Sequence, residues 1–145
     1  MVERTFHMLL YRAFHAQRNY LRSYLGEVGL EVGQPKLLGY LFFHGPCRQS
    51  QLAGYFDIDS AAVSRMLDSL ERSGLILRKA DENNRRCNQV QLTDRGRQAY
   101  EVWLERCRET EEVMLQGFTP QEQAQFADFL SRAYQNFRKE REKEE

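Results

Sequence analysis

The chain of 145 residues is long enough for one compact domain or for two small domains that pack closely together. Hydrophobic residues make up 41% of it and charged residues 29%, a balance that argues against a disordered chain and predicts a packed core. The longest apolar run, residues 37–43, is too short to span a membrane, and residues 1–12 do not resemble a signal peptide. Three widely spaced cysteines without a CxxC pair argue against a disulfide framework and a structural zinc site. We therefore expect a cytoplasmic protein with reduced thiols, no membrane contact, no metal and no cofactor.

The first two thirds of the chain carry a net positive charge and the last third a net negative charge, although the formal net charge of the whole is zero. Residues 1–97 carry 14 Lys and Arg against 10 Asp and Glu, whereas residues 98–145 carry 7 against 11. A DNA-binding surface needs local rather than overall positive potential, because phosphate contact and counterion release are local events. Exposed helices also become acidic by chance. The asymmetry therefore supports a nucleic-acid partner without establishing one.

Apolar residues with a period near 3.6 predict helices over most of the chain. The first, over about residues 3–26, is apolar on more than one side, which indicates packing against its own domain and against a second subunit. The second begins at Pro35, which suits a first helical turn, and ends near His44. These two helices precede the most informative part of the sequence.

Two further short helices are predicted over residues 49–56 and 60–73. The first of them has no good capping residue before it, so Ser50 or water is expected to cap it. Asp59 is expected to cap the second, and Gly74 to close it in a left-handed conformation. Two helices joined by so short a turn are typical of a helix-turn-helix.

The apolar spacing then changes from helical to alternating, which predicts a two-stranded hairpin over residues 75–92 with a polar turn at residues 81–86. Thr93 is expected to cap a long helix that ends near residue 117. Residues 119–122 form a capping box with proline at the first helical position, and they begin the last helix. The polar tail, residues 138–145, is expected to fray.

A helix-turn-helix followed by a hairpin with arginines near its tip is typical of proteins that read DNA. Short side chains at the start of the helix 60–73 allow close approach to base edges, and Arg65 can reach guanine or phosphate. A start of a helix, as at Ser50, suits phosphate contact, although plain solvation explains it equally well. The predicted DNA-binding residues are Ser50, Ser60, Ala61, Ala62, Ser64, Arg65, Arg78, Arg85 and Arg86.

The order of these elements resembles the multiple antibiotic resistance regulator (MarR) family of bacterial transcription factors, and the resemblance covers nearly the whole chain. The residues that carry it are Gly45-Pro46, Leu52-Ala53, Ser64-Arg65, Leu70-Glu71, Ser73-Gly74-Leu75-Ile76, Arg78, Asn84, Arg86, Val90, Leu92-Thr93 and Gly96. Each alone is weak, because many winged helices share such helix ends, but their joint order and spacing are specific.

The resemblance implies a mainly α fold with a small β-hairpin wing, that is, a winged helix-turn-helix joined to a helical dimerisation region. Residues 33–97 would form the DNA-binding domain, and residues 1–32 and 98–145 the dimerisation region. A homodimer of this kind places two heads on adjacent turns of a palindromic operator, about 34–36 Å apart. Repression is the more common direction of control in the family.

The wing differs from the family pattern at one position. The family usually has an aspartate two residues before the wing arginine, whereas this chain has Asn84 before Arg86. An amide cannot form the charge-assisted bidentate pair that a carboxylate gives a guanidinium. A solvated turn at Arg85 and Arg86, and a surface ion pair between Arg65 and Asp68, are alternatives to DNA contact.

Members of the family often bind small aromatic or phenolic ligands in a crevice between the dimerisation helices and the DNA-binding head. Aromatic and titratable residues that could line such a crevice are also the usual contents of a core or a dimer interface. The predicted effector pocket consists of His15, Tyr11, Tyr24, His44, Trp103 and Cys107.

Nothing in the sequence carries an enzymatic motif such as a glycine-rich phosphate loop, GxSxG or HExxH. We therefore expect a regulator that binds double-stranded DNA and is released by a small molecule. Two alternatives remain open. One is a winged-helix module that binds protein alone; the other is a redox-responsive regulator in which Cys87, beside two arginines, forms a reactive thiolate.

Overall fold

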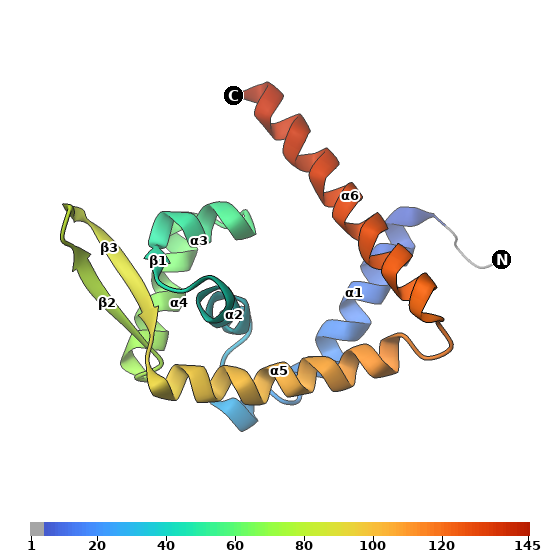
Figure 1. Ribbon diagram of the computed structural model, residues 1–145, viewed down its shortest axis with the longest axis horizontal. Helices are drawn as coiled ribbons and strands as arrows, with labels where there is room; N and C mark the ends of the chain where they lie inside the picture. The colour runs from blue at the N-terminus through green and yellow to red at the C-terminus, as the bar shows by residue number, and fades with distance from the viewer. Residues whose placement is uncertain (1–4) are drawn as a thin grey trace. The chain divides into compact units, whose positions relative to one another are not determined.

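The computed structural model describes residues 5–145, without the side chains of Asp81 and residues 84–88. The chain forms two compact units, residues 1–110 and 111–145 (Figure 1). The mainly α fold with a small winged sheet agrees with the prediction. No helix among the described residues has the length and apolar character to cross a membrane. The elements are α1 (Phe6–Arg22), η1 (Gly26–Val28), α2 (Gln34–His44), β1 (Cys47–Arg48), α3 (Gln49–Phe56), α4 (Ser60–Arg72), β2 (Ile76–Asp81), β3 (Asn84–Leu92), α5 (Asp94–Met114) and α6 (Pro120–Glu144).

The first helix is shorter than predicted at both ends. Thr5 caps it, because the Thr5 hydroxyl accepts a hydrogen bond from the Met8 amide at 3.4 Å. After Arg22 the backbone tightens, and the Tyr24 amide donates to the Leu21 carbonyl instead of continuing the α-helical pattern. A short 3-10 turn, η1, then leads toward α2.

The two helices of the helix-turn-helix lie where they were predicted. The expected cap at Ser50 is wrong: Gln51 reaches back, and its side-chain oxygen accepts from the Arg48 amide at 2.8 Å. The prediction for Asp59 is confirmed, since its carboxylate accepts from the Ala61 amide at 3.2 Å. Gly74 closes α4 with φ of 75°, as predicted, and the Leu75 amide donates to the Leu70 carbonyl.

The sheet has three antiparallel strands in the order β1-β3-β2, one more than the predicted hairpin (Figure 1). The extra strand, β1, pairs Cys47 with Val90. The predicted turn at residues 81–86 is also too long, because the strands extend to Asp81 and from Asn84. The pairing changes from Ala80 with Asn88 to Asp81 with Asn84, so residues 85–87 form a bulge in β3.

The core of the first unit lies among α2, α3, α4 and the inner face of the sheet. Its largest fully buried side chains are Leu37, Leu38, Leu41, Leu52, Val63, Leu67, Leu70, Ile76 and Val90. The start of α5 is fastened to the end of α4, because the Thr93 hydroxyl donates to the Gly74 carbonyl at 2.7 Å and accepts from the Gly96 amide at 3.0 Å. The predicted cap at Thr93 is confirmed.

The second unit is dominated by α6. Thr119 and Glu122 form the predicted capping box: the Glu122 amide donates to the Thr119 hydroxyl at 3.1 Å, and the Thr119 amide donates to the Glu122 carboxylate at 2.9 Å. The expectation that residues 138–145 fray is wrong, because α6 continues to Glu144. Charge pairs one helical turn apart, such as Glu140 with Lys143, support this polar end.

Candidate DNA-binding surface and ligand cavity

The solvent-facing side of α4 carries the short side chains that the sequence assigned to DNA. Ser60 and Ala61 are exposed at the first turn, Ala62 and Ser64 are half-buried, and Arg65 is exposed one turn further along. The opposite side packs into the core through Val63, Leu67 and Leu70. The first turns of the helix thus present a shallow surface from which Arg65 extends, and such a surface suits insertion into a major groove.

The alternative role of Arg65, an ion pair with Asp68, is not formed. Among the described side chains Arg65 has no carboxylate partner, and Asp68 instead binds Arg78 of β2. The Arg65 guanidinium is therefore available to a ligand outside the chain.

Arg78 lies on the inner face of the sheet. Its cross-strand partner is Val90, which also pairs with Cys47, and both of these side chains are buried. The Arg78 guanidinium contacts Asp68 and lies 3.2 Å from the Glu71 carboxylate, which also accepts from the Arg78 amide at 3.2 Å. These bonds raise the pKa of Arg78 above its ordinary value, the hydrogen bond to Glu71 contributing most. Arg78 joins α4 to the wing and is only 17% exposed.

The predicted wing residues Asn84, Arg85, Arg86 and Cys87 lie outside the described side chains. Their backbone belongs to the first part of β3, including the bulge at residues 85–87. A bulge redirects the side chains of a strand, and such irregularities are frequent beside functional sites.

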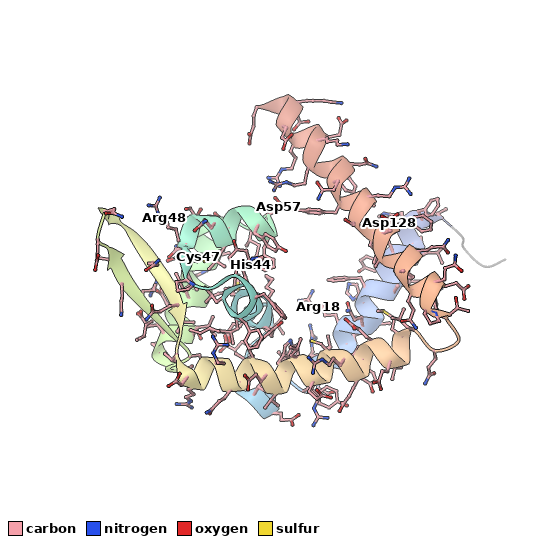
Figure 2. The ribbon with its side chains drawn as sticks, in the orientation of Figure 1. Arg18, His44, Cys47, Arg48, Asp57 and Asp128 are labelled. Atoms are coloured by element: carbon pink, nitrogen blue, oxygen red, sulfur yellow. The ribbon has the colours of Figure 1, made fainter. Side chains whose placement is uncertain are left out.

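The start of α3 adds a cation that the sequence reasoning missed. Ser50 is exposed there, and Arg48, which immediately precedes the helix, is exposed beside it (Figure 2). Arg48 could have been noticed as the only cation next to the predicted helix start, where phosphates commonly bind.

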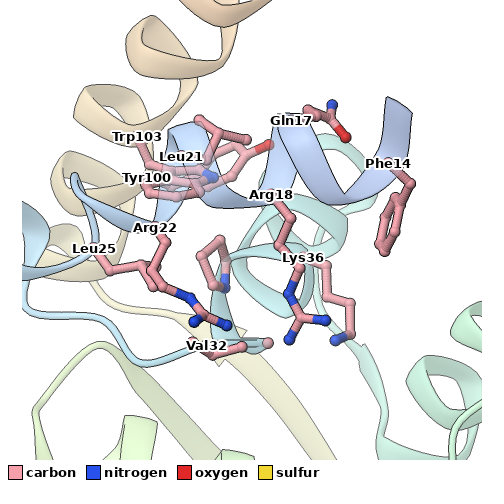
Figure 3. A pocket seen from close by; sticks show the side chains of 12 residues that line it. Phe14, Gln17, Arg18, Leu21, Arg22, Leu25, Val32, Lys36, Tyr100 and Trp103 are labelled. Atoms are coloured by element: carbon pink, nitrogen blue, oxygen red, sulfur yellow. The ribbon is translucent and has the colours of Figure 1, made fainter. Parts of the chain in front are cut away.

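A cavity of about 380 Å³ lies between α1, the first turn of α2 and α5 (Figure 3). Of the six residues predicted for an effector pocket, only Trp103 lines it. The lining residues are Phe14, Gln17, Arg18, Leu21, Arg22, Leu25, Val32, Gly33, Pro35, Lys36, Tyr100 and Trp103.

The other five predicted pocket residues lie elsewhere in the first unit. Tyr11 and His15 stack on each other along α1, with ring centroids 4.4 Å apart. His44 stacks on Tyr40 at 4.4 Å, and Tyr24 lies under the Arg106 guanidinium at 4.6 Å. Cys107 is half-buried on α5. Helical spacing could not separate these aromatic contacts from a cavity lining.

Three cations line the cavity, and none of them pairs with a carboxylate among the described residues. Figure 3 shows the Arg18, Arg22 and Lys36 side chains directed toward the side of Val32, with the rings of Tyr100 and Trp103 at the opposite side. Burial lowers the pKa of Lys36 from its ordinary value, and the Arg18 charge lowers it further. An anion with an apolar ring would satisfy both sides of this cavity.

The environment of Cys47 does not favour a reactive thiol. Cys47 is buried, and burial raises its pKa to about 11, which disfavours the thiolate. Among the described residues, no three His, Cys, Asp or Glu side chains converge to hold a metal.

The comparisons with known proteins agree with this geometry. The sequence model of the MarR family matches residues 30–88. YdgJ, an uncharacterised HTH-type transcriptional regulator of Bacillus subtilis (strain 168), is 32% identical over 108 residues, which are 74% of this chain and 66% of that protein. The alignment thus spans just under two thirds of that relative's length.

Two solved structures are similar over nearly the whole chain. The crystal structure of MarR has a TM-score of 0.85 and 26% identity, and 97% of each chain is covered. A MarR-family transcriptional regulator from Listeria monocytogenes, solved with a 26mer DNA, has a TM-score of 0.86 and 25% identity, covering 92% of this chain and 89% of that one.

Proposed function

We propose that this chain, which belongs to the MarR family of transcriptional regulators, represses transcription in the bacterial cytoplasm as a homodimer bound to a palindromic operator. A small anionic aromatic ligand in the cavity releases it from the DNA. The observation that carries the proposal is the exposed surface of α4, where Arg65 extends beyond short side chains and has no carboxylate partner among the described residues.

The chemistry of the head supports DNA as the partner. Ser60, Ala61 and Ser64 can approach base edges closely, and Arg65 can donate two parallel hydrogen bonds to a guanine. Ser50 and Arg48 are exposed at the start of α3, and both side chains can donate hydrogen bonds to phosphate. Arg85 and Arg86 of the wing supply charge for the neighbouring minor groove. The relative from Listeria was solved with DNA, which supports the same role here.

Exposed apolar residues on the terminal helices support a homodimer. On α1, Phe6 is 93% exposed, and on α6 Phe137 is 72% exposed. Neither helix contains a buried residue within the single chain. Exposed apolar residues in such numbers mark interaction surfaces, and most homo-oligomers are symmetric dimers.

The cavity supports a ligand that is both aromatic and anionic. The Tyr100 and Trp103 rings offer an apolar surface, and Arg18, Arg22 and Lys36 offer positive charge that no described carboxylate neutralises. A carboxylate or phenolate there would offset the burial and the Arg18 charge, which both lower the pKa of Lys36. The ligand class proposed is therefore benzoates and acidic phenols.

Selection of duplexes from a randomised 30-base-pair library, followed by mobility-shift titration, tests the DNA-binding proposal. We expect a palindromic sequence, and we expect Arg65→Ala to weaken its binding about 10- to 100-fold and to change its sequence preference. Arg132→Ala is the matched control, because Arg132 is an exposed cation on α6. Failure to select any sequence would instead favour the protein-binding module. Titration with benzoate then tests the release.

A further inference from the structure

Gly33 lies between the ligand cavity and α4, which is the recognition helix of the proposed DNA-binding surface. Gly33 lines the cavity and precedes α2, with φ of 89°. A Cβ atom at this position would lie 3.3 Å from the Lys36 ammonium nitrogen and 3.4 Å from the Met66 sulfur. The Lys36 ammonium and the Met66 sulfur therefore both lie next to the space that a side chain of residue 33 would occupy.

Met66 links this contact to the DNA-binding surface of α4. Its side chain is half-buried and packs against the core of the head, whereas its neighbour Arg65 is exposed. An α-helix is stiff over one turn because each amide is bonded to the preceding turn. The backbone of Met66 and the backbone of Arg65 therefore move together.

We propose that Met66, whose sulfur lies beside Gly33, transmits the charge state and occupancy of the cavity to the recognition helix. This inference rests on the proposed function, since it gives that cavity its route to the DNA. Lys36 and Arg18 repel each other while the cavity is empty of anions. An anion between them draws the Lys36 ammonium toward the cavity, and the first turn of α2 moves away from Met66. The recognition helix then loses the support that sets its angle.

A double-mutant cycle with DNA affinity as the readout tests this coupling without any ligand. Lys36→Gln removes one of the three cavity charges, and Met66→Ala removes the sulfur that lies beside Gly33. We expect Lys36→Gln to change the affinity for the selected duplex at least about threefold in the wild-type background, and by less than about 1.5-fold in the Met66→Ala background.

Arg72→Gln is the matched background for this cycle, because Arg72 lies on the same helix and is exposed. The effect of Lys36→Gln should remain full there. An equal effect of Lys36→Gln with and without Met66, or no effect in the wild type, would overturn the inference.

A second measurement is independent of DNA binding. The chain has four methionines, so the Met66 methyl signal can be assigned by NMR after methyl labelling. Arg18→Gln, on the α1 side of the cavity, should shift the Met66 signal, and the shift should vanish in a Lys36→Gln background. If Arg18→Gln leaves the Met66 signal unchanged, the coupling is refuted and the proposed function is unaffected. If the protein selects no duplex, the proposed function is refuted, and the Met66 signal can still be measured.

Discussion

The DNA-binding head, formed by α2, α3, α4 and the sheet, buries its apolar residues within the chain. The terminal helices α1 and α6 leave theirs exposed. In the head, residues of α2, α3, α4 and the sheet close around fully buried side chains such as Leu37, Leu67 and Val90. In α1 and α6 no residue is buried, although both are rich in aromatic residues. The head therefore folds on contacts within the chain, whereas the apolar faces of the terminal helices require a further surface.

The largest effect is expected from a substitution that separates the head from α5. A Cβ atom at Gly96 would lie 1.9 Å from the Leu75 carbonyl oxygen, a backbone atom that cannot move alone. We expect Gly96→Ala to destabilise the protein by about 3 kcal/mol or more, because the start of α5 must leave the end of α4. Chemical denaturation followed by circular dichroism measures it.

Gly54→Ala is the matched control, since a Cβ there meets no atom within 4 Å and the position is helical. This variant should be as stable as the wild type or slightly more stable. Equal stability of the two variants would show that the junction of α4 and α5 tolerates separation.

The next effect concerns the terminal helices alone. Phe137→Asp places a charge in the exposed apolar face of α6, so the dimer dissociation constant should rise at least about 100-fold, which corresponds to roughly 3 kcal/mol. Sedimentation equilibrium measures the constant, and Gln135→Asp, an exposed polar position two residues away, is the control. A dimer unaffected by Phe137→Asp would place the interface elsewhere.

Apolar periodicity predicted the helices of the head well, because α3 and α4 bury one face each within the chain. It missed β1, since a strand of two residues, Cys47 and Arg48, has no period to detect. The sequence also led us to assign both Arg78 and Arg65 to DNA contact, whereas the strand register places Arg78 on the inner face of the sheet. That distinction depends on pairing between strands, which composition does not encode.

The lining of the cavity shares only Trp103 with the predicted effector pocket. Trp103 was identified, whereas Arg18, Arg22 and Lys36 were not, because they come from segments that meet only in the folded chain. His44 was assigned to the cavity for its residue type, and it stacks on Tyr40 instead. A single Arg or Lys in a sequence with many charged residues does not indicate a site. Only the convergence of these side chains around the cavity distinguishes them.

Arg78 and Arg65 are expected to affect different properties of the head: Arg78 its stability and Arg65 its binding to DNA. Arg78→Gln removes hydrogen bonds to Glu71 and Asp68, so the free energy of unfolding should fall by roughly 1–3 kcal/mol. Its effect on DNA affinity should leave the salt dependence unchanged, because Arg78 holds the wing and faces inward. Arg65→Ala should do the reverse, with an unchanged melting temperature and weaker binding. A lower salt slope for Arg78→Gln would assign Arg78 to a phosphate.

The smallest effect is expected where α5 meets the connection between α1 and α2. The Arg106 guanidinium donates to Glu27 at 2.8 and 3.0 Å, and this bond holds the pKa of Glu27 below its ordinary value. A carboxylate with a lowered pKa in the folded state stabilises the fold above its ordinary pKa, and that contribution is lost as the pH falls through the folded-state value.

Glu27→Gln should therefore lower stability slightly at pH 7, and the difference from the wild type should shrink toward pH 3. Denaturation at several pH values measures it, with Glu31→Gln, an exposed position in the same connection, as the control. Because Glu27 is exposed, its ion pair is expected to contribute little to stability. A stability difference between Glu27→Gln and the wild type that stays constant with pH would show that the pair acts through packing alone.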